Sequence, residues 1–221
     1  MLKIENVQIV GLEPAIRGMR NPMNSWAKSD SEFTAFTGHE VVPKISVGEN
    51  DLKLMNRLAA GGPVHAKYRR MIVVYLDITA PLYWWKEFDT YKVGTVANSC
   101  STMHKLTSKE FELDDFSHDH LLHTGEGDNP IDRIISWLNL YRRRYLEATN
   151  EDTKKEYWWQ MIQLLPSSYN QRRTVMLNYE VLVNIYRWRR DHKLDEWHTF
   201  CDWIESLPYA ELITGGAKRE G

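Results

Sequence analysis

The stretch MIVVYLDI, residues 71–78, constrains this chain more than any other segment. Apart from Asp77 its residues are aliphatic, β-branched or aromatic, which is the composition of a strand buried in a sheet. Ala80-Pro81 then breaks the pattern. Residues 3–10, KIENVQIV, alternate in polarity and predict a second strand. We therefore expect a small central sheet.

Helical periodicity dominates the second half of the chain. Asn129-Pro130 predicts the start of a long helix, with proline at a first helical position. Its apolar stripe is Ile131, Ile134, Ile135, Leu138, Tyr141 and Tyr145. Further helices are predicted from about Asp152 to Leu165, over residues 173–190 and from Leu194 to Leu207.

The first half mixes shorter elements. Pro14 suits a helix start, with Gly18 and Pro22 as interruptions, and Asp51 is placed to cap a second helix. Gly61-Gly62-Pro63 ends that second helix. The remaining predictions are a helix over 82–92, a small polar loop over 93–104, an irregular acidic stretch over 107–128 and a frayed tail over 214–221. Together these features predict one α+β domain over residues 1–213, followed by a flexible tail.

Charge and composition exclude several classes of protein. The 221 residues carry a formal net charge of -2, with 43% hydrophobic and 26% charged residues, as in ordinary soluble domains. Such a chain has no global positive field for nucleic acid or an anionic membrane, so any phosphate binding depends on local residues. No run approaches the roughly 20 apolar residues of a membrane helix, and no signal peptide is expected. Two distant cysteines indicate a reducing compartment, and we expect a cytoplasmic protein.

Three side-chain groups have a chemical and a structural interpretation. His118, His120 and His123 could ligate a metal, but they lack a recognised spacing and we expect a solvated loop. Cys100 could act as a nucleophile on a pyrimidine, although a small packed cysteine is the expectation. The many aromatic residues, nine Trp and eleven Tyr, are expected mostly in the core and at subunit interfaces. No metal site is therefore predicted.

The order of elements around Ala80-Pro81 resembles that of the flavin-dependent thymidylate synthases, the ThyX family. Their diagnostic segment reads Arg-His-Arg, a hydrophobic residue, two small residues and Asn-Glu-x-Ser, ending in Arg-Tyr. Here Thr90-Tyr91-Lys92 stand at the Arg-His-Arg positions. With one inserted residue, Asn98 matches the Asn and Ser101 the Ser, while Ser99 replaces the Glu and Met103-His104 replace Arg-Tyr.

The C-terminal half resembles the family more fully. Leu165-Pro166 is followed by Asn178, Asn184 and Arg189 at the family's spacing, without a gap, and EWHTFCDWI continues the match. In the family the two asparagines lie by the flavin, and the arginine orients the uracil ring of the nucleotide. The resemblance covers about residues 50–105 and 160–207.

The resemblance implies an enzyme that binds FAD between the subunits of a homotetramer. Its substrates would be a pyrimidine deoxynucleotide and a folate, with a one-carbon unit transferred to C5 of uracil. The catalytic positions would be Arg189 and Ser101, and the cofactor-binding positions Tyr91, Lys92, Asn98, Asn178 and Asn184.

The motif arginines are replaced, which opens an alternative. Thr90 and Lys92 lack the planar guanidinium fork that holds phosphates and carbonyl oxygens bidentately. Arg172 and Arg173 are candidates for a repositioned anion site. The alternative is a non-catalytic or repurposed member of the fold that binds a nucleotide or assembles without methyl transfer.

Helical phase favours Arg189 as a ligand-binding residue. If 173–190 is one helix, Asn178 and Arg189 lie within about 20° of one face, while Asn184 faces a different neighbour, for example a second subunit. The alternative interpretation is a surface arginine paired with Asp191 or Asp195.

Overall fold

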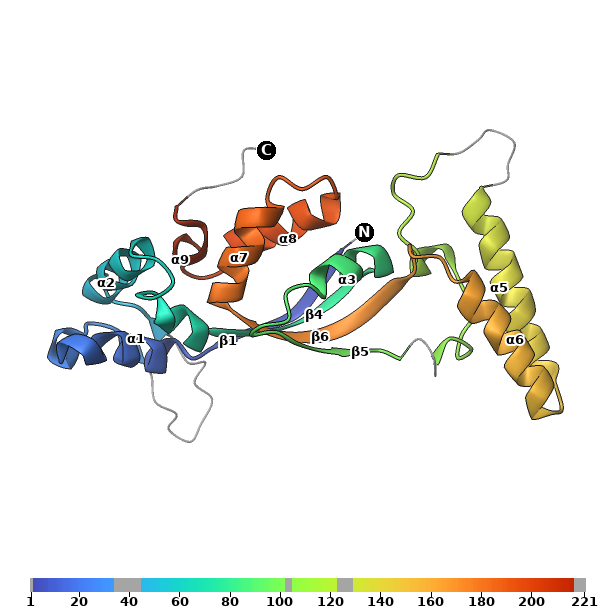
Figure 1. Cartoon of the computed structure of the whole chain (residues 1–221), viewed down its shortest axis with the longest axis horizontal. Coiled ribbons are helices and arrows are strands. Elements are labelled where there is room, and N and C mark those ends of the chain that lie inside the picture. The colour runs from blue at the N-terminus through green and yellow to red at the C-terminus, as the bar shows by residue number, and fades with distance from the viewer. Residues whose placement is uncertain (1, 34–44, 102–104, 123–128, 217–221) are drawn as a thin grey trace. The chain divides into compact units, whose positions relative to one another are not determined.

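A computed structural model describes residues 2–33, 45–101, 105–122 and 129–216 of the chain. The fold class is α+β, as predicted, with a small antiparallel four-stranded sheet of order β1-β4-β6-β5 (Figure 1). Its strands are β1 (Lys3–Val10), β4 (Val73–Pro81), β5 (Val96–Ser99) and β6 (Asn170–Asn178), and β2 (Glu32–Phe33) pairs with β3 (Ile45–Ser46). The longer helices are α1 (Leu12–Arg20), α2 (Glu49–Ala60), α3 (Leu82–Phe88), α5 (Pro130–Glu147), α6 (Glu151–Leu164), α7 (Tyr179–Arg189) and α8 (Asp195–Glu205). Short helical turns are η1 (Asn21–Met23), η2 (Trp26–Lys28), η3 (Lys67–Met71), η4 (Leu113–Asp115) and α9 (Glu211–Thr214).

The strand expected at 71–78 is confirmed as β4, with burial on one face. Val74, Leu76 and Ile78 are at most 1% exposed, whereas Tyr75 is 43% exposed. Successive side chains of a strand point to opposite faces, so this alternation places one face of β4 in the core. The strand runs on through Pro81, and α3 follows directly.

The chain divides into two compact units, each described here by itself. The first contains residues 1–5, 77–90 and 97–174, and the second contains residues 6–76, 91–96 and 175–221. Each of the four strands of the sheet has residues in both units. The single domain over 1–213 stays a prediction.

The first unit contains the helical hairpin predicted from Asn129 onward. Pro130 is the first residue of α5, and the Asn129 side chain accepts a hydrogen bond from the backbone N–H of Ile131. Asn150 caps α6 in the same way, and the two helices pack together (Figure 1). The predicted stripe is confirmed, because its members are buried in or packed against a cluster of Leu106, Phe111, Phe116, Ile131, Leu138 and Met161.

The aromatic residues of α3 are also part of this unit's interior. Trp84, Trp85 and Phe88 are at most 1% exposed, and their ring centres lie 5.0 to 5.3 Å apart. These three side chains are therefore core residues of the chain itself.

The prediction of one helix over 173–190 is wrong for its first third. Residues 170–178 form β6, and α7 begins at Tyr179. Val175 and Leu177 are buried while Met176 is less so, which is the period-two pattern of a strand. Asn178 ends the strand and starts the helix, since its side chain accepts a hydrogen bond from the backbone N–H of Val181.

In the second unit, α7 packs against α8 and α9, and α1 packs against η3 and α2. Trp197, Phe200 and Ile204 of α8 are fully buried, which confirms the predicted last helix. The Tyr179 hydroxyl donates to the Pro208 carbonyl at 2.7 Å and so links the start of α7 to the segment after α8.

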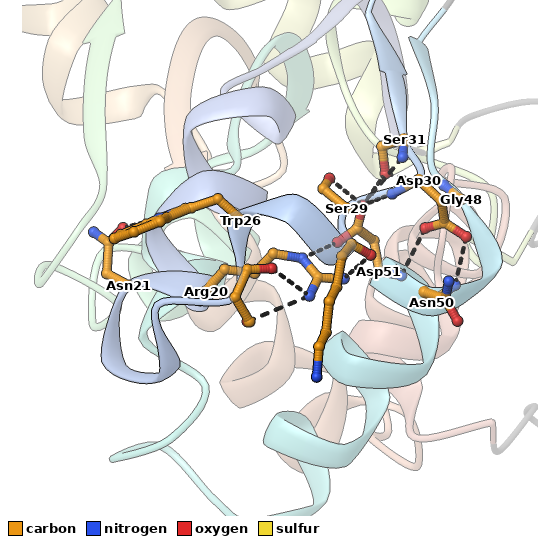
Figure 2. Close-up of polar contacts among 11 residues, drawn as sticks. Arg20, Asn21, Trp26, Ser29, Asp30, Ser31, Gly48, Asn50 and Asp51 are labelled. Atoms are coloured by element: carbon orange, nitrogen blue, oxygen red, sulfur yellow. Dashed lines mark hydrogen bonds and ion pairs between the residues drawn. The ribbon is translucent and has the colours of Figure 1, made fainter.

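Two expectations near the N-terminus are corrected. Gly18 does not interrupt a helix; it lies inside α1, close to the Met71 side chain. Asp51 does not cap α2, whose N-cap is Gly48. The Asp30 carboxylate instead accepts hydrogen bonds from the amides of Asn50 and Asp51 at 2.9 and 3.1 Å (Figure 2). A cap from 20 residues away has no local sequence pattern.

The segment expected as a loop over 93–104 contains strand β5, whose residues are all exposed. Residues 102–104, with Met103-His104, lie outside the described part, as do residues 217–221 of the predicted tail, while Thr214 still belongs to α9. None of the described helices is long and apolar enough to span a membrane.

Candidate functional site

Arg189, the last residue of α7, packs against two aromatic rings. Its guanidinium carbon lies 4.8 Å from the centre of the Trp197 ring and 5.6 Å from that of Tyr91. Its Nε donates a hydrogen bond to the Tyr91 hydroxyl at 2.9 Å. Tyr91 was the second residue of the degraded motif, so the structure brings together two positions that the resemblance had singled out separately.

The rings give this cation a partly dry setting. Trp197 is fully buried, Tyr91 and Arg189 are half-buried, and the two rings meet edge to face with centres 6.1 Å apart. Cation–π contacts hold a guanidinium flat without neutralising its charge. An arginine in such a setting suits the recognition of a carbonyl oxygen or another anionic group by charge-assisted hydrogen bonds.

The surface alternative for Arg189 involves Asp191 and Asp195, and each of these acids also contacts a neighbouring side chain. Asp191 lies 3.4 Å from Nε of Arg190, and Asp195 lies 3.4 Å from Nδ1 of His198. Arg189 also donates a hydrogen bond to the Tyr91 hydroxyl, and its role as a surface or a ligand-binding residue stays a prediction. The helical pattern of the sequence is enough to place Arg189 near the end of α7. No sequence pattern within residues 175–195 indicates that Tyr91 is its partner.

Asn178 has a structural task at the entrance to α7. While its Oδ1 caps the helix, its Nδ2 would lie 3.0 Å from a Cβ placed on Gly94. Gly94 has φ +79°, a backbone conformation that favours glycine. The segment 91–96 and the start of α7 therefore approach closely, and the Asn178 amide is directed at the backbone. The expected common helical face of Asn178 and Arg189 does not apply, because Asn178 precedes the helix.

The other predicted site residues are more exposed. Lys92 and Asn184 are exposed residues of the second unit, and Asn98 on β5 is an exposed residue of the first. Ser101 is half-buried in the first unit, where its carbonyl accepts from the Lys105 amide at 3.1 Å. The roles of all these residues stay predictions.

Arg172 and Arg173, the candidates for a repositioned anion site, are both held by carboxylates. Arg172 pairs with Asp77 at 2.8 Å, and Arg173 pairs with Asp89 at 2.7 Å. Arg173 also lies 4.2 Å from the centre of the Trp85 ring. A phosphate at either arginine would have to compete with an ion pair already in place.

Sequence reasoning missed Thr95, which lies in the motif segment between Gly94 and β5. Its Oγ1 is buried and has no hydrogen-bond partner among the described residues. A buried hydroxyl without a partner is uncommon, because the lost hydrogen bond costs about 1–3 kcal/mol. In the sequence, the only indication of a function for Thr95 is its position in a stretch of small and polar residues.

The expectation of a packed Cys100 is wrong, because this thiol is exposed and only Cys201 is buried. The backbone of Cys100 is hydrogen-bonded to β6, so this residue of the expected loop continues the sheet pairing of β5. His118 contacts the Phe116 carbonyl through Nδ1 at 2.9 Å, and His120 is exposed. His123 lies outside the described residues, and those described contain no group of three metal-ligating side chains.

Comparison with known proteins supports the fold. No family model matches the sequence, and no curated protein matches it. Two structures of the flavin-dependent thymidylate synthase ThyX from Helicobacter pylori, each with FAD and dUMP, match at 16% and 17% identity with TM-scores of 0.63 and 0.65. The matches cover 96% and 98% of this chain, and 96% and 100% of the other chains.

A third similar structure extends the range of substrates within this fold. It is the UMP/dUMP methylase PolB from Streptomyces cacaoi bound with 5-Br dUMP, at 11% identity and a TM-score of 0.58. This match covers 97% of this chain and 95% of that one. At these identities the likeness establishes the fold, and the chain has the fold of ThyX.

Proposed function

We propose that this chain binds a pyrimidine deoxynucleotide of the dUMP class and acts on its uracil ring as a flavin-dependent methylase of the ThyX type. The observation that carries the proposal is the packing of Arg189 against Tyr91 and Trp197. The similar structures hold FAD with dUMP or, in the methylase, 5-Br dUMP, which supports the choice of ligand.

The proposed role of Arg189 is to hold the base. A uracil ring presents two carbonyl oxygens, and a guanidinium donates to such oxygens through a fixed planar fork. The aromatic surroundings fix the plane of that fork and lower the local dielectric, which strengthens the hydrogen bonds to the base. Lys92, exposed nearby in sequence, would supply a point charge for a phosphate.

The proposed cofactor is FAD, and residues of the motif segment suit the binding of its flavin ring. The buried Thr95 Oγ1 without a described partner, together with Tyr91 and Lys92, suits a group with hydrogen-bonding edges such as a flavin ring. When bound, FAD would supply hydride. Asn98 and Asn184 are further proposed contacts, and Ser101 is a proposed catalytic residue. The folate and the homotetramer, implied by the resemblance, complete the proposal, in which Asn184, an exposed residue of α7, contacts a second copy.

A second function is favoured by a specific observation. The two arginines that could replace the lost motif arginines are engaged with Asp77 and Asp89. Lys92 is then the cation at the motif positions, and its ammonium group binds the pyrophosphate of FAD less strongly than arginines at these positions would. A protein that binds the nucleotide without flavin and without methyl transfer is consistent with this chemistry.

The visible absorbance of the purified protein separates the two functions. A flavin absorbance band that elutes with the protein on gel filtration, and that passes into the supernatant when the protein is denatured and precipitated, is expected from a flavin-dependent methylase. If the protein is colourless and reconstitution with FAD leaves the free flavin fluorescence unquenched, the nucleotide-binding function stands alone. Light scattering on the same sample tests the homotetramer.

Calorimetric titration with dUMP tests the role of Arg189 under either function. Arg189→Lys keeps the charge and removes the fork, so affinity should fall by roughly ten- to hundredfold, as for about 1.5–3 kcal/mol of charge-assisted hydrogen bonding. Arg187→Lys, an exposed position on the same helix, is the matched control and should bind like wild type. Equal affinity of wild type and Arg189→Lys would remove Arg189 from the site.

A further inference from the structure

A basic cavity of about 550 Å³ lies between α2 and the segment from the end of α1 to η2, all within the second unit. Its wall contains four cationic side chains, Arg20, Lys28, Lys53 and Arg57, and its described lining residues include no acid. The chain as a whole is slightly acidic, so this concentration of one sign is local. The lining residues of this cavity do not include Arg189, Tyr91 or Trp197.

One wall of the cavity is fixed by Arg20. Its Nε donates to Asp51 at 2.6 Å, its Nη1 to the Ser25 carbonyl at 3.2 Å and its Nη2 to the Lys28 carbonyl at 3.1 Å. Figure 2 shows the guanidinium reaching from the end of α1 to Asp51 on α2. These bonds hold the backbone that carries Lys28 beside α2, so the cavity is a built feature of this unit.

The other wall is one face of α2. Asn50, Lys53 and Arg57 recur at helical spacing, and Lys53 and Arg57, four residues apart, are neighbours of like charge. Lys53 pairs with the exposed Glu49 at 2.6 Å, whereas Lys28 and Arg57 have no ion pair with any described residue. Like charges brought together in this way repel each other, and a bound anion would relieve that repulsion.

We propose that this cavity binds a small anion with two or more phosphate groups, as inorganic pyrophosphate or as the diphosphate of a nucleotide. Three cations on two walls match an extended anion better than a single phosphate, which would reach only part of them. Asn50 and Ser25 add neutral polar groups to the wall, and the volume is within the range of small-molecule sites. Lys28, Lys53 and Arg57 are the proposed contacts.

The test titrates pyrophosphate into the full-length protein, without flavin or pyrimidine nucleotide, so its outcome is separate from that of the proposed function. Inorganic phosphate and ADP are titrated in parallel. Pyrophosphate should bind at least about tenfold more tightly than phosphate, and binding should weaken strongly with added salt, because exposed charges are screened. Tighter binding of ADP than of pyrophosphate would assign a nucleotide as the source of the phosphates, and equal binding would assign the free anion.

The double variant Lys28→Gln, Arg57→Gln removes the two cations without a described ion pair. Both side chains are exposed, so the fold should be kept, and pyrophosphate affinity should drop by about tenfold. Arg143→Gln, Arg144→Gln on the exposed side of α5 makes the same change in net charge and should bind like wild type. The proposal is overturned if both double variants lose the same affinity, if neither does, or if wild type does not bind pyrophosphate.

Discussion

Arg20 and Arg189 each end a helix of the same compact unit, and their surroundings differ in kind. Arg20 is 4% exposed, and its donors go to a buried carboxylate and to backbone carbonyls. Arg189 is half-buried and lies against the rings of Tyr91 and Trp197. The first arrangement joins α1, η2 and α2, and the second holds a cation beside two aromatic rings that meet edge to face. The two arginines therefore differ in both burial and partners, and these differences accompany a structural role for Arg20 and the proposed binding role of Arg189.

The largest expected effect comes from breaking the Arg20 arrangement with Asp51→Asn. This leaves a buried guanidinium without its counter-charge, and the free energy of unfolding should fall by about 3–5 kcal/mol. Urea unfolding followed by circular dichroism measures the loss. Asp191→Asn, which breaks the exposed pair with Arg190, should cost no more than about 1 kcal/mol. Similar losses for both variants would contradict a structural role for the buried pair.

A second way to examine the same pair is pH. Burial alone would raise the pKa of Asp51, but hydrogen bonds from Ser29, Ser31 and Arg20 outweigh it and hold the pKa below its usual 3.8. A carboxyl whose pKa is lowered by folding stabilises the fold fully above its unfolded pKa, and this contribution is lost as pH falls through the folded pKa. The stability gap between wild type and Asp51→Asn should therefore be constant from pH 7 to 5 and shrink below about 3.8. A gap that already closes at pH 5 would contradict the lowered pKa.

The substitution Tyr91→Phe tests whether the Tyr91 hydroxyl positions Arg189. It removes the hydroxyl that accepts from Arg189 but keeps the ring beneath the cation. Stability should fall by about 0.5–1.5 kcal/mol, and dUMP affinity by roughly two- to tenfold, because the fork is less well oriented. Tyr141→Phe on α5, whose ring stacks on Trp137, is the control and should leave dUMP binding unchanged. An unchanged affinity in Tyr91→Phe would mean that Tyr91 does not position Arg189.

The smallest effect is expected at Arg172, whose ion pair with Asp77 is partly exposed. Arg172→Gln should cost at most about 1 kcal/mol of stability and leave dUMP affinity as in wild type. Thermal unfolding and calorimetry on one sample measure both. A tenfold loss of dUMP affinity would return Arg172 to the list of anion-binding residues.

The elements with a strong local pattern were predictable from the sequence. Asn129-Pro130 and the stripe that follows it predicted α5, and the apolar run after Met71 predicted β4. The boundary at Asn178 was missed, because Val175 and Leu177 of a strand and Val181 and Leu182 of a helix make one continuous apolar pattern. The residues of β5 are all exposed, so only their pairing in the sheet makes them a strand.

The candidate site was predictable to a lesser extent. Arg189 and Tyr91 were named from the resemblance, but their contact joins residues 98 positions apart. The ion pairs that occupy Arg172 and Arg173 also depend on partners more than 80 positions away in sequence. Cys100 was expected to be packed because small apolar residues usually are, while its exposure follows from its place after an exposed strand.

The indole of Trp197 is an intrinsic fluorescent probe next to Arg189. It is fully buried, it meets Tyr91 edge to face, and the Arg189 cation lies 4.8 Å from its centre. A positive charge held over one part of an indole shifts the energy of its excited state, so any ligand that draws Arg189 away should change the emission of this residue. The difference spectrum between wild type and Trp197→Phe would isolate that emission from the other eight tryptophans and report occupancy of the site without a label.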